Sequence, residues 1–535
     1  MHVDARTLPD ATLIEGDLCI AGAGPAGIAM ALEWEGRGAR VILLEGGGFH
    51  LEAPVQDRYR GESVGLPYYP LESARLHFFG GASGHWGGFC SPFDPIDFEE
   101  RAWVPRSGWP FDREELEPFY ARAQELVELG PYDFDTESWS SRDPRLVPLP
   151  LDPARVWTKM WQFSSPPTPF GRRYRERITA SANVHLFTHA NAVEVVLHPD
   201  GRAVSELRVS NLAGRTHHVR AHRYVLACGA IQNARLLLAS TGIATRGVGN
   251  GEDLVGRHFM EHVEMPVGEL VLAHPDPVSL YRLDWGFTRA RGELALTAAV
   301  QRERRLLNGS VELTRREGPT ELRGTFQELP PQVLAGIVEY GAMVERGEIV
   351  PDRPDAPRHE PWREFTLTTR HEQAPNPDSR VMLSTERDAL GVPRARLDWR
   401  LSELELRSMR ETCRELGREV GRSGVGRLRL LEWLQAEGGD WPDFVSGGWH
   451  HMGTTRMHTD PRQGVVDPHS RVHGIGNLYL AGASVFPTGG CANPTLTLLA
   501  LALRLSDHLK ATGPGGEGRE PAHFEGRRCF ITPCC

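Results

Sequence analysis

The segment Gly22-Ala-Gly24-Pro-Ala-Gly27 constrains the fold of this chain more than any other feature of its sequence. It follows a short apolar run at 17–21 and precedes a helix-favouring stretch at 28–34. A second apolar run, Val41-Ile-Leu-Leu44, ends at Glu45. A strand, a tight glycine turn, a helix and a second buried strand in this order predict a parallel βαβ unit.

Each glycine of the segment has a separate steric role in such a unit. Gly22 permits the tight turn, Gly24 lets a pyrophosphate approach the backbone, and Gly27 lets the helix pack closely on the strand. The phosphates then lie at the positive end of the helix, and Glu45 accepts hydrogen bonds from the adenosine ribose. The segment therefore predicts a bound dinucleotide without separating FAD from NAD. No second segment of this kind follows a strand, which favours one tightly held flavin that works directly on substrate.

The pattern of strand, glycine and helix recurs twice later in the chain. Tyr224-Val-Leu-Ala-Cys-Gly229 leads into a predicted helix at 230–240, and Asn477-Leu-Tyr-Leu-Ala-Gly482 precedes a predicted helix at 494–509. Such junctions place backbone N–H groups at a sheet edge. We therefore predict an α/β fold whose Rossmann-like FAD-binding domain is discontinuous and comprises residues 1–100, 180–262 and 445–512.

The residues between these pieces predict a second, inserted domain. Stretches 265–300 and 364–400 are rich in strand-forming residues, and 402–422 has the pattern of a charged amphipathic helix. We expect a substrate-binding domain over residues 101–179 and 263–444, built on an antiparallel or mixed β-sheet flanked by helices. We also expect a helix at 113–129, a variable elaboration at 302–360, and a flexible C-terminal tail at 513–535.

Composition excludes several classes of protein. With 40% hydrophobic and 24% charged residues, the chain is globular, and a net charge of −10 argues against a nucleic-acid partner. The only lysines are Lys159 and Lys510, so a Schiff-base mechanism is not expected. The apolar run at 496–503 is too short to cross a membrane, and no secretory signal is visible.

The cysteines favour a reducing compartment over a metal site. Five of them are scattered without metal-ligand spacing, which predicts a cytoplasmic protein without a bound metal; they are Cys19, Cys90, Cys228, Cys413 and Cys491. Three more cluster at the C-terminus, where a metal site or a disulfide is the alternative to a flexible tail; they are Cys529, Cys534 and Cys535.

Three further motifs, taken with the glycine turn, resemble those of the glucose–methanol–choline (GMC) oxidoreductase family. They are Gly80-Gly-Ala-Ser-Gly-His-Trp-Gly-Gly88, His450-His-Met-Gly-Thr-Thr-Arg-Met457, and Gly482-Ala-Ser-Val-Phe-Pro487 leading into Cys491-Ala-Asn-Pro-Thr-Leu-Thr497. Weaker matches lie at Asp253–His258 and Asn376–Arg380. The resemblance implies FAD-dependent oxidation of an alcohol, in which the substrate carbon gives a hydride to flavin N5.

By register with the family motifs, His450 is the expected general base and Asn493 the group that holds the substrate oxygen. A histidine suits the base because its ordinary pKa is near neutral, and an asparagine amide donates without a change of charge. His451 is the rival base, which we expect to pack behind His450. His77, His258 and His262 are expected to be structural.

The resemblance also implies the residues that contact FAD. The expected contacts are Gly22, Gly24, Gly27, Glu45, Gly80, Ser83, His85, Val193, Gly229, Ala483 and Asn493. Many family members have aspartate at the position of Gly482, so the hydrogen bond of that aspartate to the ribityl or phosphate region of the flavin is not expected from the side chain here. His85 occupies the position at which pyranose oxidases and some related dehydrogenases bond covalently to the flavin. Covalent attachment and a structural or flavin-stacking role are both open.

The glycine-rich loop is closest in character to those of sugar dehydrogenases and pyranose or glycoside oxidases. We therefore expect a polyhydroxylated substrate, such as a sugar, a glycoside or an aminoglycoside or aminocyclitol. The electron acceptor (oxygen, a quinone or a protein) and the oligomeric state are not predicted. Three alternatives remain: a non-redox lyase like the hydroxynitrile lyases, a non-catalytic dinucleotide-binding protein, and a nicotinamide-dependent dehydrogenase.

Overall fold

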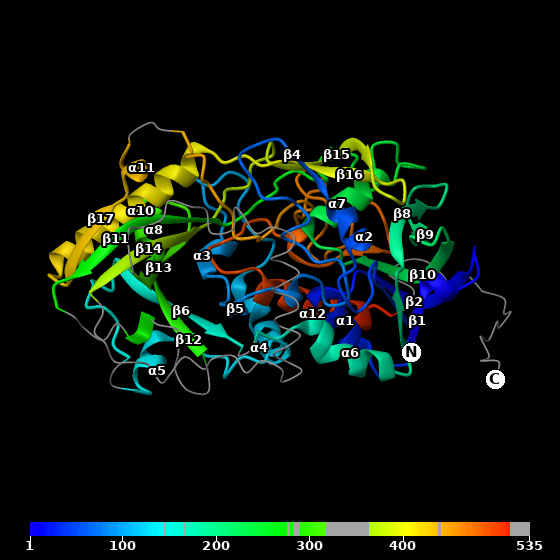
Figure 1. Cartoon of the computed structure of the whole chain (residues 1–535), viewed down its shortest axis with the longest axis horizontal. Helices are drawn as coiled ribbons and strands as arrows, with labels where there is room; N and C mark the ends of the chain where they lie inside the picture. Colours follow the sequence, from blue (N-terminus) through cyan, green and yellow to red (C-terminus); the bar gives the residue numbers. More distant parts are fainter. Residues whose placement is uncertain are drawn as a thin grey trace.

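Two large β-sheets lie toward opposite ends of the molecule, with a small third sheet along one side (Figure 1). The computed structural model describes residues 1–143, 146–164, 167–274, 279–281, 289–316, 363–436 and 440–513. Most of the elaboration predicted at 302–360 and nearly all of the C-terminal tail, with its three cysteines, lie outside the described residues.

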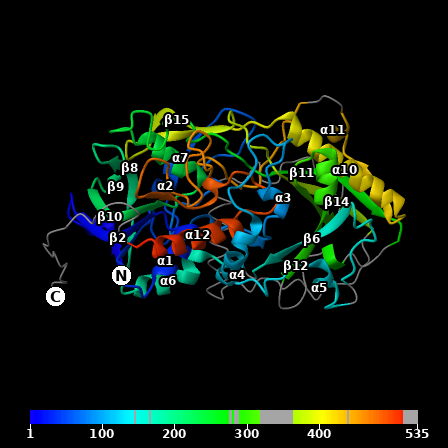
Figure 2. The same ribbon diagram turned by 180° about the vertical axis from the view of Figure 1, so that it is seen from behind.

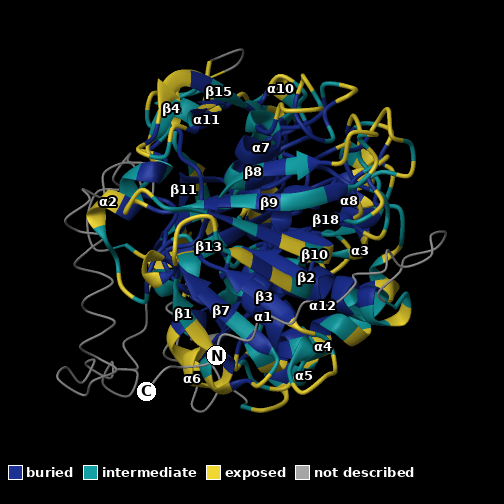
Figure 3. Cartoon of the chain, turned by 90° about the vertical axis from the view of Figure 1, so that its right-hand side faces the viewer, coloured by how far each residue is buried: buried dark blue, intermediate teal, exposed yellow. Residues whose placement is uncertain are grey.

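The first sheet is a parallel sheet extended at one edge by an antiparallel pair. Its order is β1 (His2–Asp4), β7 (Val184–Thr188), β3 (Val41–Leu44), β2 (Leu13–Ala21), β10 (Thr216–Leu226), β9 (Val204–Ser210) and β8 (Asn191–Leu197), with β18 (Leu478–Leu480) beside β10. All pairs are parallel except β10 with β9 and β9 with β8. The strand β3 is buried along its whole length, as expected for a central parallel strand covered on both faces (Figure 3).

Helices from distant parts of the chain pack on this sheet and on one another. The helix α1 (Pro25–Trp34) contacts β2 and β3 and packs against α12 (Thr495–Ala511) and α6 (Phe170–Ala180). Another helix, α7 (Ala230–Ala239), contacts β8. The predicted pattern of strand, glycine turn and helix is therefore present at each of its three occurrences.

The second sheet is antiparallel throughout and lies at the left of Figure 1. Its order is β17 (Gly426–Leu430), β11 (Val263–Leu272), β14 (Glu364–His371), β13 (Gly309–Arg315), β12 (Arg289–Leu296), β6 (Val156–Phe163) and β5 (Phe89–Cys90). The helix α10 (Glu403–Arg422) starts at a capping box of Ser402 and Glu405 and packs on this sheet (Figure 2). The predicted fold class, a Rossmann-like sheet beside an antiparallel or mixed sheet flanked by helices, is confirmed.

The third sheet joins an early segment to a late one. It contains β15 (Arg380–Arg387), β16 (Pro393–Asp398) and β4 (Gly61–Ser63), with β16 parallel to β4. The predicted domain ranges remain a prediction, because the strands show how the pieces pair without fixing where one domain ends.

The helix predicted at 113–129 is shorter than expected. A 3₁₀ turn, η4 (Arg113–Leu116), is followed by α4 (Glu117–Leu126). Pro118 stands in the first turn of α4, where its missing N–H is tolerated, and it disfavours a continuous α-helix through the preceding residues. Within the described residues, no helix has both the length and the apolar character needed to cross a membrane.

Candidate active site

A cavity of about 630 Å³ extends from the parallel sheet to the antiparallel sheet. Ala21, Leu44 and Ala227 bring the carboxyl ends of β2, β3 and β10 to its wall. Side chains from β11, β13 and β14 line it as well. The carboxyl ends of parallel strands are where open α/β sheets bind their ligands, and a volume of this size suits a cofactor together with a small substrate.

The glycine turn separates into two packing positions and one open position. Gly22 has a φ of 103°, and a Cβ there would lie 2.6 Å from the carbonyl oxygen of Ala227. A Cβ on Gly27 would lie 1.9 Å from the oxygen of Gly22. A Cβ on Gly24 would meet nothing within 4 Å, and Gly24 lines the cavity whereas Gly27 does not. Gly24 is therefore the position at which a ligand can approach the main chain.

Three helices begin at the cavity wall without a side-chain cap. Their N-cap residues are Gly24 for α1, Gly229 for α7 and Pro494 for α12, and all three line the cavity. A Cβ on Gly229 or Gly482 would also meet nothing within 4 Å. Uncapped N–H groups at the positive ends of helices bind anions, so this wall suits the pyrophosphate and the flavin of FAD.

Glu45 lies at the cavity wall at the end of β3 and holds the glycine turn. Its Oε2 accepts a hydrogen bond from the backbone N–H of Ala23 at 3.1 Å, and its Oε1 accepts one from Gly47 at 2.9 Å. Burial raises the pKa of Glu45 to about 7, against the lowering effect of these backbone donors. Ribose hydroxyl donors at this position would stabilise the charged form.

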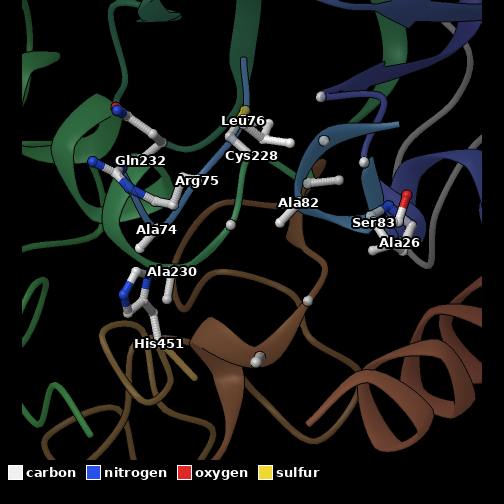
Figure 4. A pocket seen from close by; sticks show the side chains of 18 of the residues that line it. Ala26, Ala74, Arg75, Leu76, Ala82, Ser83, Cys228, Ala230, Gln232 and His451 are labelled. Carbon is white, nitrogen blue, oxygen red and sulfur yellow. The ribbon is translucent and has the colours of Figure 1, made fainter. Parts of the chain in front are cut away.

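The glycine-rich loop brings Ser83 and His85 to the cavity, while Gly80 supports them from behind. Ser83 Oγ donates to the oxygen of Gly80 at 2.7 Å and accepts from the N–H of Phe170 at 3.1 Å. A Cβ on Gly80 would lie 2.5 Å from the nitrogen of Gly171, so Gly80 has a packing role. Figure 4 shows Ala82 and Ser83 near Ala26 of α1, away from His451.

The ring of His85 is held in place with one nitrogen left over. Its Nδ1 lies 2.8 Å from the carbonyl oxygen of Ala82, and the ring stacks on Trp449 with centroids 5.2 Å apart. Since a carbonyl only accepts, Nδ1 carries the hydrogen and Nε2 has a lone pair. That Nε2 is buried and has no hydrogen-bond partner among the described residues.

Val193, the expected neighbour of the adenine, does not line the cavity; Asn191 and Ala192 do. The pairing of β8 with β9 shifts by one residue between Ala192 and Glu194. A bulge of this kind interrupts the alternation of side chains along a strand, and the contact of Val193 with the adenine stays a prediction. Ala483, by contrast, lines the cavity as expected.

His450 and Asn493 meet on the cavity wall. The amide Nδ2 of Asn493 lies 2.9 Å from Nε2 of His450, and both residues line the cavity. The other ring nitrogen of His450, Nδ1, lies 2.9 Å from Nδ1 of His262 and 3.7 Å from Oε1 of Glu264. Burial, and to a lesser degree the charge of Arg370, hold the pKa of His450 well below its ordinary value, which keeps the ring neutral.

His451 also lines the cavity but has different neighbours. Its Nε2 lies 3.4 Å from the hydroxyl of Tyr69, and its ring packs against Tyr68 and Phe259. Within the described part of the chain, Asn493 is hydrogen-bonded to His450 and not to His451. This geometry favours His450 over its neighbour as the base.

A buried cluster of charges lies on the side of the antiparallel sheet. Arg370 pairs with Glu264 at 2.8 Å and with Glu293 at 3.3 Å, and Arg291 pairs with Glu293 at 2.8 Å and with Glu312 at 2.5 Å. Three of its members line the cavity: Glu264, Glu312 and Arg370. With three carboxylates and two guanidiniums, the cluster gives this wall an acidic excess.

Sequence reasoning missed His262 and this charge cluster. His262 was expected to be structural, yet it contacts His450 across 188 residues of chain. The cluster depends on cross-strand register, in which Glu264 of β11 stands directly opposite Arg370 of β14. The sequence does show charged residues at positions of these strands that are otherwise apolar. That pattern identifies a charge cluster only once the pairing of the strands is known.

Comparison with known proteins agrees with this geometry. Models of the family described as GMC oxidoreductase match residues 174–264 and 375–502. The 6'''-hydroxyparomomycin C oxidase of Streptomyces lividus is 27% identical over 92% of this chain and 90% of its own. The paromamine 6'-oxidase of Streptomyces fradiae is 29% identical over 83% of this chain and 80% of its own.

A solved structure shows the same fold over nearly the same extent. Pyridoxine 4-oxidase from Mesorbium loti superposes with a TM-score of 0.55 at 18% identity, covering 92% of this chain and 99% of its own. With the cavity at the sheet edge, the uncapped helix ends and the two matching family models together, the chain belongs to the glucose–methanol–choline oxidoreductase family of FAD-dependent enzymes that oxidise alcohols.

Proposed function

We propose that this enzyme oxidises a hydroxyl group of a polyhydroxylated substrate, such as a sugar, a glycoside or an aminoglycoside or aminocyclitol, with His450 as the general base. The observation that carries the proposal is the contact of 2.9 Å between Asn493 Nδ2 and His450 Nε2 at the cavity wall. A hydroxyl oxygen at this point would lie within reach of both a neutral base and an amide donor.

The two side chains have complementary roles in this proposal. His450 Nε2 takes the hydroxyl proton, and Asn493 Nδ2 donates to the oxygen as negative charge develops on it. The bound FAD supplies the hydride acceptor. The N-terminus of α12, which starts just after Asn493, adds a positive field at the same wall and favours a nearby anion.

The acidic wall favours a substrate that carries an amino group. Glu312 is paired with Arg291 and also lies near Arg370 and the carboxylate of Glu293. Burial raises the pKa of Glu312 above its ordinary value. A substrate ammonium group would add the missing positive charge. The names of two relatives, a 6'''-hydroxyparomomycin C oxidase and a paromamine 6'-oxidase, point to the same class of substrate.

The lone pair of His85 supports the proposal of a covalent bond to FAD. The buried, unpartnered Nε2 belongs to a ring held on its other side by Ala82 and Trp449, which suits attachment to a fixed group at the cavity. Acid precipitation of the holoenzyme distinguishes the two states. A flavin that remains with the pellet supports the bond, and a yellow supernatant contradicts it.

Titration of the anaerobic holoenzyme with sugars, glycosides and amino sugars tests the function itself. The expected result is bleaching of the oxidised flavin spectrum by at least one of these alcohols. A yellow protein that none of them bleaches would favour a non-redox lyase, and a protein that binds no flavin would favour the non-catalytic alternative. Bleaching by NADH instead would favour a nicotinamide-dependent reaction.

A further inference from the structure

We propose that His262 is a positioning residue that holds His450 in the tautomer with its hydrogen on Nδ1 and its lone pair on Nε2. The proposal rests on the function proposed above, in which Nε2 of His450 takes the hydroxyl proton. His262 lies just before β11, is fully buried and has not been assigned a part in the chemistry.

The positions of the hydrogens follow from the contacts, starting at Gly489. The carbonyl oxygen of Gly489 lies 3.1 Å from Nε2 of His262, and a carbonyl only accepts, so that nitrogen carries the hydrogen. Burial lowers the pKa of His262 to about 3, so the ring is neutral and its Nδ1 has a lone pair.

The tautomer of His262 determines the tautomer of His450 through their shared contact. Nδ1 of His450 lies 2.9 Å from the lone pair on Nδ1 of His262, so it must supply the hydrogen. Since His450 is also neutral, its Nε2 is bare, and it accepts from the amide of Asn493 at 2.9 Å. Each of the three contacts from Asn493 to Gly489 then joins one donor to one acceptor.

The opposite tautomer of His450 is excluded by its surroundings. It would place two bare nitrogens 2.9 Å apart inside the protein, with no hydrogen between them. A buried acceptor left without a donor destabilises the arrangement. The second neighbour of Nδ1, Glu264, lies at 3.7 Å, which is beyond a good hydrogen bond, so His262 is the group that selects the tautomer.

Two matched substitutions separate this role from packing. His262→Asn keeps an oxygen acceptor near the position of Nδ1, whereas His262→Gln places its amide near the position of Nε2 and keeps only the contact with Gly489. In anaerobic stopped-flow experiments, we expect His262→Gln to lower the limiting rate of flavin reduction about 10- to 100-fold with less than about a threefold change in substrate Kd. His262→Asn should recover most of that rate. Equal rates in the two variants would overturn the proposal.

Nitrogen-15 NMR of the resting holoenzyme, labelled at histidine and assigned through the same variants, tests the tautomer without any substrate. We expect a protonated Nδ1 and a bare Nε2 on His450, and the reverse on His262. A protonated Nε2 on resting His450 would overturn the proposal, even if the enzyme oxidises alcohols. If no alcohol reduces the flavin but the NMR pattern is as expected, the proposed function fails while the positioning contact stands.

Discussion

The wall of the cavity built by the parallel sheet exposes main chain at several glycines, whereas the wall built by the antiparallel sheet presents charged side chains from three strands. On the first, Gly24, Gly229 and Gly482 leave the backbone open beside uncapped helix ends. On the second, Glu264, Glu312 and Arg370 reach the cavity from three strands. The first wall depends on short segments of local sequence, and the second depends on how distant strands pair.

Loss of the proposed base should have the largest effect at the junction of the two walls. His450→Ala should lower the rate of anaerobic flavin reduction by about 10²–10⁴-fold, the range typical of general-base catalysis, with FAD still bound. The matched control is His451→Ala, which should lower that rate by less than about tenfold. If the control is the slower variant, the base assignment belongs to His451.

The main-chain wall is tested by adding one methyl group at two glycines. Gly24→Ala should weaken FAD binding about 10- to 100-fold, because overpacking costs ~1–3 kcal/mol, while the fold stays intact. Gly27→Ala should instead lower the melting temperature, since its Cβ would lie 1.9 Å from the oxygen of Gly22. FAD titration and thermal unfolding of the apoproteins measure the two effects. Identical behaviour would remove the distinction between the open and the packing glycine.

Acid should change the contributions of His262 and Glu45 to stability in opposite directions. The pKa of His262 is lowered to about 3 from 6.5, so the unfolded chain binds a proton that the folded chain refuses, and stability is lost as the pH falls below about 6.5. At pH 5 this cost is about 2 kcal/mol. The pKa of Glu45 is raised from 4.5 to about 7, so the folded chain binds this proton more tightly than the unfolded chain. The resulting stabilisation of the fold is fully present below pH 4.5 and is lost as the pH rises toward 7.

The variant His262→Asn isolates the effect of acid on His262. Denaturant unfolding of the holoenzyme at pH 7 and pH 5 should show a smaller loss of stability in the variant than in the wild type. An equal loss in both proteins would mean that His262 remains neutral for no energetic cost, which contradicts its burial.

The smallest expected effect concerns the choice of substrate. Glu312→Gln should reduce kcat/KM for an amino sugar about 5- to 10-fold and leave that for the matching neutral sugar within about twofold, as expected for a partly exposed charge. The side chain of Glu312 is 25% exposed, which limits the gain from its charge. A parallel loss on both sugars would show that Glu312 supports the wall without selecting an amine.

The parts of the fold that are local in sequence could be predicted. The strand Val41–Leu44 coincides with the apolar run that predicts it. The helix after Gly24 differs from its prediction only by a few residues at its start. The helix expected at 113–129 is too long because apolar spacing takes no account of Pro118, which stands in the first turn of α4. Local signals of this kind predict the glycine turns and helix starts on the parallel-sheet side of the cavity.

The parts of the site that depend on strand register could not be predicted. The bulge between Ala192 and Glu194 interrupts the alternation along β8, and no residue type at that position marks it. The contact of His262 with His450 and the pairing of Glu264 with Arg370 join residues more than a hundred positions apart. One sequence does not reveal such pairs, because only the assembled sheet brings them together.

A structure of the holoenzyme with a bound polyhydroxylated substrate, captured with reduced flavin, tests the central claim most directly. FAD should extend from the glycine turn toward Asn493, and the hydroxyl oxygen of the reacting carbon should lie within hydrogen-bond distance of both His450 Nε2 and Asn493 Nδ2. A substrate hydroxyl that instead contacts His451, or a flavin held outside this cavity, would contradict the account.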